Sequence, residues 1–290
     1  MITRSIKREY IKLWQPIFLF FIMMFLLAFG SFMAMDYLPP ILEQTLEWPK
    51  EMLAFLGMSN VYNGNTGLLV FYLGLIFTNM VAMALCMNSA NIMNEDEEWG
   101  ITIFYLNQPY TKTQIFFLRL IAFLGSVLIK WAGYICAIFV SLKFLCEKLD
   151  ISFEKELTNI HMIAWKGFPV LFLIATIIVL YSMSESRSMS YQDMALTLCM
   201  FSFLLGNAYK VTDYIAYHLR TLQQNAKQIS EISETLEKFR CVYPFTLFNI
   251  LNKEVSPLPE NIFLIYSGIG ALFLIISWFA YYIKNITQDV

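Results

Sequence analysis

The sequence has few charged residues for its length. Of its 290 residues, 14% are charged and 58% are hydrophobic, against about 25% and about 45–50% in average soluble domains. So few charges cannot cover the surface of a soluble protein, so a large apolar area must face something other than water. The net charge of −2 also leaves no basic footprint for nucleic acid. The composition therefore excludes a soluble globular enzyme, a disordered chain and a nucleic-acid binder, and it indicates a membrane protein.

Two further absences narrow the chemistry. The only two histidines, His161 and His218, are far apart and show no metal-ligand spacing. None of the 12 glycines precedes a lysine, so the chain lacks the G-x-x-x-x-G-K-[ST] loop that binds nucleotide phosphates. We therefore expect no enzymatic activity and no cofactor or metal site in this chain.

Long runs without charge predict membrane-spanning helices, because about 20 apolar residues cross a hydrocarbon core of about 30 Å. No stretch alternates with period two over ten residues, so barrel strands are not expected. We expect an all-α polytopic membrane protein with a single transmembrane domain over 1–290. The six expected spans are at about 15–35, 67–93, 113–145, 162–184, 191–217 and 261–283.

The N-terminus carries four basic residues and one acid, which are Arg4, Lys7, Arg8, Lys12 and Glu9. Basic residues beside the first span favour a cytoplasmic N-terminus, and six spans then place the C-terminus in the cytoplasm as well. Apolar residues repeat every three or four positions over residues 1–14, which predicts an elbow helix in the headgroup layer. A disordered basic tail is the alternative. The expected location is the cell (plasma) membrane.

The segment after the second expected span has the pattern of a short amphipathic helix over about 95–107. Asn94 is a good N-cap, and the acids from Glu95 to Glu98 occupy the first turn, where the helix dipole favours negative charge. An apolar stripe follows. Thr111 and Gln114 have capping-box spacing and can start the third span. A rigid cytoplasmic helix of this kind is typical of a docking surface.

The same segment resembles the cytoplasmic motif of ABC type-2 exporter permeases. The matching residues are Glu98-Trp-Gly-Ile-Thr102 and Leu106-Asn-Gln-Pro109-Tyr-Thr-Lys-Thr-Gln114, although Ile101 separates the usual Gly-Thr pair. Tyr243-Pro-Phe-Thr-Leu-Phe248 before the last span also fits. The basic elbow helix and the six spans extend the resemblance over the whole chain.

The resemblance implies a non-catalytic permease subunit of an ATP-driven exporter. Its coupling helix would dock on a separate ATP-binding subunit, present in two copies, on which ATP and magnesium would be bound. A second permease chain, identical or different, would complete the pathway. The docking residues carried over are Glu95, Glu98, Trp99, Gly100, Thr102, Ile103 and Leu106. The alternative for this helix is that it lies at the membrane interface without a partner. The alternative for the protein is a secondary transporter or channel that is not coupled to an ATPase.

Lys130 is the one charge that the expected spans do not place at an interface. Counted from Thr113 at about 1.5 Å per residue, it lies about 25 Å deep, near the far surface; counted from Arg119, it lies about 16 Å deep, near mid-membrane. At mid-membrane a lysine needs a polar cavity or a partner, which would make it part of a substrate path. The alternative is snorkelling to the interface beside Trp131.

The remaining connection, an outer loop over 218–260, contains an amphipathic pattern at steps of three and four. Such a helix would either pack on a neighbour or lie on the lipid headgroups. Cys146 and Cys241 both fall on the expected outer side, where they would either pair or stay apart.

Overall fold

The computed structural model describes residues 12–44, 66–93, 111–183, 190–201 and 261–283, together with the single residues 204, 232 and 235. Within these ranges the chain is helical apart from short turns and caps, and no strand occurs. The expected all-α class is confirmed for this part of the chain.

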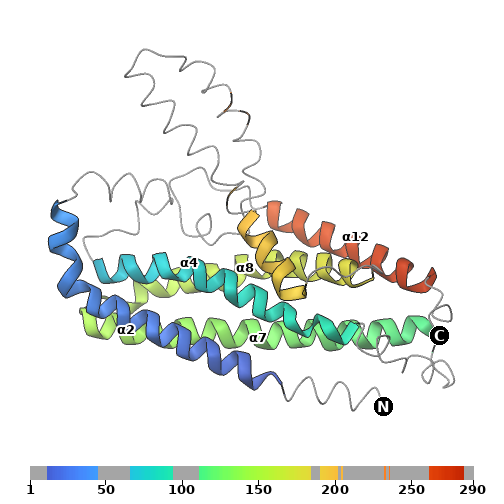
Figure 1. Cartoon of the computed structure of the whole chain (residues 1–290), viewed down its shortest axis with the longest axis horizontal. Helices are drawn as coiled ribbons and strands as arrows, with labels where there is room; N and C mark the ends of the chain where they lie inside the picture. Colours follow the sequence, from blue (N-terminus) through green and yellow to red (C-terminus); the bar gives the residue numbers. More distant parts are fainter. Residues whose placement is uncertain are drawn as a thin grey trace.

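In the described residues the fold consists of five long helices and one short 3₁₀ segment (Figure 1). Their bounds are α2 Trp14–Gln44, α4 Thr66–Met87, η1 Asn88–Met93, α7 Lys112–Leu149, α8 Phe153–Ser182 and α12 Asn261–Ile283. A further helical stretch covers 191–201. Within the part of the chain that the structure describes, five candidate spans are long and apolar enough to cross a membrane: 14–35, 66–93, 112–149, 153–182 and 264–283. These helices indicate a multi-pass membrane protein.

The start of α7 is fixed by a capping box, as the sequence predicts. The Thr111 side chain accepts a hydrogen bond from the Gln114 backbone N–H at 3.2 Å, and the Gln114 side chain accepts one from the Thr111 N–H at 2.9 Å. At the other end, Asp150 adopts the left-handed conformation with φ 54° and donates its N–H to the Cys146 carbonyl. Residues 150–152 then turn the chain directly into α8.

Contacts between aromatic rings, and the contact of Trp131 with Gly167, show which helices run parallel and which run antiparallel to one another. Phe139 of α7 contacts Phe153 of α8, and Trp131 lies against Gly167, so α7 and α8 are antiparallel. Tyr281, near the end of α12, contacts Phe116 near the start of α7. Helix α12 therefore runs antiparallel to α7 and parallel to α8, against which it packs (Figure 1).

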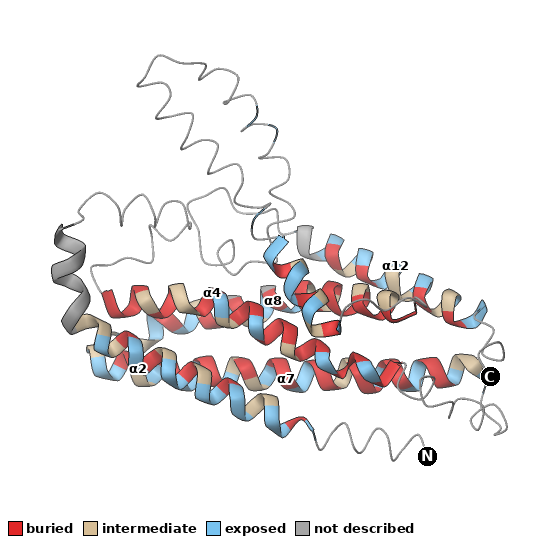
Figure 2. Ribbon diagram, viewed as in Figure 1, coloured by how far each residue is buried: buried red, intermediate tan, exposed pale blue. Residues whose placement is uncertain are grey.

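Burial differs between the helices (Figure 2). Helices α4, α7 and α8 supply most of the buried side chains. In α2 and in α12, by contrast, only 22% of the apolar 18-residue stretch is buried. Their outward faces carry large apolar side chains such as Phe18 and Leu264, which are 68% and 73% exposed. An apolar exterior over a packed interior is the pattern expected of helices that face lipid.

Two boundaries differ from the sequence expectation. Helix α8 begins at Phe153, nine residues before the expected span, because Glu154 and Glu156 occupy its first turn, where the helix dipole accepts acids. Lys12 and Leu13 form a turn and α2 begins at Trp14, with Pro16 in its first turn, where a proline costs the helix no hydrogen bond. The rest of the expected elbow helix, the outer loop 218–260 apart from two single residues, and most of the span 191–217 lie outside the described residues.

Candidate functional site

The structure describes one of the eight site residues predicted from the sequence, Lys130. The seven docking residues, from Glu95 to Leu106, lie outside the described residues, so docking stays a prediction. Cys146 is a buried free thiol, and Cys241 is also outside the described residues.

Lys130 lies inside the helix bundle, near the middle of α7. Its side chain is 4% exposed. The ammonium donates hydrogen bonds to the Ser89 hydroxyl and, at 3.4 Å, to the Leu85 backbone carbonyl. Ser89 in turn lies 2.5 Å from the Ser126 hydroxyl of α7. The side chain therefore points across the α4–α7 contact instead of extending along its own helix to an interface.

These bonds coincide with a change in backbone geometry. Helix α4 becomes the 3₁₀ segment η1 between Met87 and Asn88, next to the carbonyl that Lys130 approaches. A cation near the C-terminal carbonyls of a helix is favourable because those carbonyls carry partial negative charge. Lys130 thus stabilises the end of α4.

Arg119 also bonds to a backbone carbonyl, at the end of the 3₁₀ segment η1. Arg119 is 3% exposed, and its guanidinium donates a hydrogen bond to the backbone carbonyl of Met93, the last residue of η1, at 3.0 Å. Both buried cations of α7 therefore bond to backbone carbonyls of the segment with which α7 packs.

A buried carboxylate lies at the opposite end of α4. Glu156, in the first turn of α8, is 8% exposed and accepts hydrogen bonds from the Tyr72 hydroxyl and, at 3.0 Å, from the Asn159 amide. The same amide donates to the Tyr72 oxygen at 3.1 Å. The three side chains form a closed triangle that compensates a carboxylate removed from water.

Together these groups form a row of buried and half-buried polar side chains at the contact of α4 and η1 with α7 and α8, which we call the polar seam. At about 1.5 Å per residue in α4 and about 2.0 Å per residue in η1, the interval from Tyr72 to Met93 is about 35 Å, comparable to a bilayer core of about 30 Å. The seam consists of Arg119, Ser126, Ser89, Lys130, Tyr134, Thr78, Asn79, Tyr72, Glu156 and Asn159.

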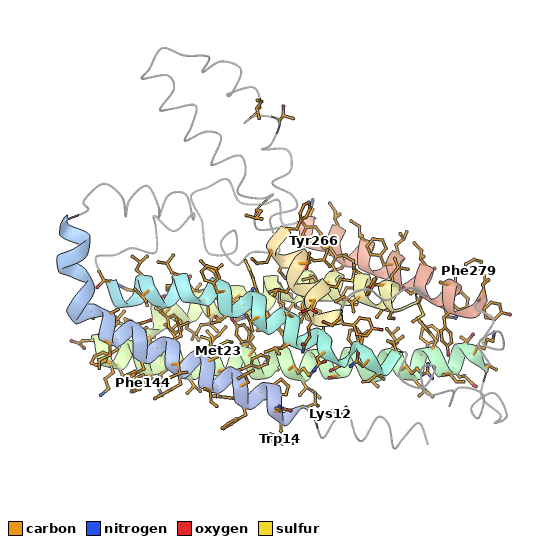
Figure 3. The ribbon with its side chains drawn as sticks, in the orientation of Figure 1. Lys12, Trp14, Met23, Phe144, Tyr266 and Phe279 are labelled. Atoms are coloured by element: carbon orange, nitrogen blue, oxygen red, sulfur yellow. The ribbon has the colours of Figure 1, made fainter. Side chains whose placement is uncertain are left out.

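A cavity of about 330 Å³ opens onto the seam at Lys130. Ser89 and Lys130 are its buried residues, and Lys12 and Gln15 at the start of α2 form part of its exposed rim. Figure 3 shows Lys12 at the start of α2, whereas Trp14 points away from the bundle. The complete lining is Lys12, Gln15, Pro16, Leu19, Leu85, Asn88, Ser89, Asn91, Lys130 and Gln192.

Sequence reasoning missed most of the seam. It used Arg119 only as a reference for the depth of Lys130, and it did not single out Glu156. A signal was nevertheless present: Tyr72 and Asn79 are seven residues apart in a charge-free run, so they share one helix face. A polar stripe on an otherwise apolar helix marks the side that faces the protein interior.

Comparison of the chain with protein-family models, with curated proteins and with solved structures finds no match.

Proposed function

We propose that the chain is a membrane permease, the membrane-spanning subunit of an ATP-driven exporter of the ABC type-2 kind. The observation that carries the permease part is the polar seam and its cavity inside an otherwise apolar helix bundle. Buried polar groups are costly in a membrane, and they line substrate or ion pathways when they are present.

The ATP-driven part depends on the motif after the second span. Residues 95–107 combine an acidic first turn with an apolar stripe, and Thr111 then starts a 38-residue helix rigidly through its capping box. A docking helix needs such a fixed attachment, because movement of a partner ATPase must reach the spans. In this proposal Trp99, Ile103 and Leu106 are the anchors that contact the ATPase.

The direction of the helices supports six spans and termini on one side of the membrane. Because α8 and α12 are parallel, the chain has to cross the bundle an odd number of times between them. Helical residues 191–201 begin in this interval. One crossing there gives six spans with both ends in the cytoplasm.

The test is co-purification of the tagged full-length chain with the ATP-binding subunit encoded beside it. We expect association with the wild-type chain and its loss in the double variant Trp99→Asp, Leu106→Asp, because two anchors become charged. Ile101→Asp is the matched control, since at 100° per residue it lies on the opposite face of the predicted helix. Retained association in the double variant would contradict docking through this helix.

A second candidate is a secondary transporter that is not coupled to an ATPase. The observation that favours it is burial of three ionisable side chains within candidate spans, which are Arg119, Lys130 and Glu156. Proton- and ion-coupled transporters commonly carry such groups. If the purified chain in vesicles moved substrate in response to a pH gradient without any ATPase, this candidate would replace the first.

A further inference from the structure

The cavity at Lys130 has a chemically one-sided lining. Both ionisable residues among its described lining residues, Lys12 and Lys130, are basic. Gln15, Asn88, Asn91 and Gln192 also line the cavity, and each amide can turn an NH₂ donor or a carbonyl acceptor toward a ligand. A lining whose described ionisable residues are both ammonium groups, with amides that can donate, favours an anionic ligand group.

The position of the two lysines fits a ligand that enters from the rim. Lys130 is buried and held in place by Ser89 and the Leu85 carbonyl, whereas Lys12 is exposed at the start of α2. The buried lysine is thus held in place at the base of the cavity, and the exposed lysine lies at its rim. A volume of about 330 Å³ lies at the small end of the range of about 300–1,000 Å³ for ligand pockets.

The apolar part of the lining continues onto the lipid-facing side of the molecule. Leu19 lines the cavity and is itself 44% exposed. On the same helix, Phe18 and Ile22 are 68% and 40% exposed. A ligand with a charged head in the cavity could therefore extend apolar chains along α2.

We propose that this cavity binds the phosphate group of an anionic amphiphile, with Lys130 at its base and Lys12 at its rim. A phosphate offers several acceptor oxygens to these donors, and lysine is a common partner of phosphate. The inference rests on the proposed function only for its membrane setting, because the cavity requires no ATPase. The same chemistry can be supplied by a phospholipid headgroup or by free phosphate.

The test measures lipid binding to the purified full-length chain in detergent by native mass spectrometry. The probes are phosphatidylglycerol, which is anionic, and phosphatidylcholine, whose phosphate is neutralised by its choline. We expect wild type to prefer phosphatidylglycerol, and Lys12→Gln and Lys130→Met each to weaken its binding about tenfold or more, because a charge-assisted bond is lost. Lys143→Gln is the matched control, since Lys143 is an exposed lysine on α7.

Competition with inorganic phosphate separates the two sources. If phosphate displaces phosphatidylglycerol, the proposal is supported and the site also accepts the free ion. If phosphate does not displace it, the proposal is supported and the site requires the whole lipid. Equal binding of the two lipids, or unchanged binding in both lysine variants, would overturn it. If Lys130→Met does not fold, Lys12→Gln at the exposed rim decides alone. ATPase association of the Lys12 variant should remain, which keeps this result separate from the docking test.

Discussion

Each charged residue of the polar seam is compensated by a specific partner. Arg119 and Lys130 bond to backbone carbonyls, and Glu156 bonds to a hydroxyl and an amide. Removal of a charge from water costs several kcal/mol, so burial without such bonds would destabilise the bundle. Among the seam's polar groups, the Lys130 ammonium and the Glu156 carboxylate each bond to two partners, whereas Asn79 Oδ1 and Arg119 Nε have no hydrogen-bond partner among the described residues.

Tyr72→Phe tests this compensation at the Glu156 end. The substitution keeps the ring and removes the hydroxyl that donates to the buried carboxylate. We expect the free energy of unfolding to fall by about 1–3 kcal/mol, the usual cost of leaving a buried polar group with one partner fewer. Chemical or thermal unfolding of the full chain in detergent measures it.

The control is Tyr282→Phe, the same change at a tyrosine that is 57% exposed on α12. It should leave stability within about 0.5 kcal/mol of wild type. Equal stability of the two variants would show that the Tyr72 hydroxyl does not support Glu156.

Individual helices were predicted from the sequence where a local rule decides them. The capping box of Thr111 and Gln114 was confirmed because it involves only four neighbouring residues. Helix α8 begins nine residues before the expected span, and the local pattern does not show this, because the first turn of α8 buries Glu156 against Tyr72 of another helix. A partner 84 residues away leaves no mark in the local pattern. For the same reason the cavity could not be assembled from the sequence, although Lys130 was singled out.

Packing of α12 on α8 depends on a glycine. A Cβ atom added at Gly270 would lie 2.8 Å from Phe172 Cε1, closer than real contacts allow, whereas one at Gly268 meets nothing within 4 Å. We expect Gly270→Leu to lower stability by about 1–3 kcal/mol through overpacking. Thermal unfolding in detergent, monitored by circular dichroism, gives the measurement.

Gly268→Leu is the control, with the same added side chain two positions away on the same helix. It should unfold close to wild type. If both variants lost stability equally, the cost would come from α12 itself and not from its contact with α8.

At the scale of the whole molecule, hydropathy predicted that helices cross a membrane but not how they pack. Apolar side chains occupy both the inward and the outward faces of α2 and α12, because lipid and protein core are equally apolar. Composition therefore cannot distinguish a lipid-facing leucine from a core leucine. The parallel course of α8 and α12 comes from contacts between distant residues such as Gly270 and Phe172.

The course of the chain makes a prediction about sidedness that labelling can test. The two ends of α7 should face opposite sides of the membrane, with Lys112 on the cytoplasmic side and Ser152, just after the helix, on the outer side. Ser152 is exposed and its side chain makes no capping hydrogen bond, so a cysteine there should cost little. In intact cells, a membrane-impermeant maleimide should label Ser152→Cys strongly.

Lys112→Cys should react only after the membrane is permeabilised, and the wild-type chain gives the background of the five natural cysteines. Reaction of both variants in intact cells would mean that α7 does not cross the membrane. Reaction of Lys112→Cys alone would invert the orientation and place the segment 95–107 outside the cell, where no ATPase could dock. The labelling pattern therefore decides, before any partner is identified, whether the proposed coupling helix is on the side of the membrane where ATP is available.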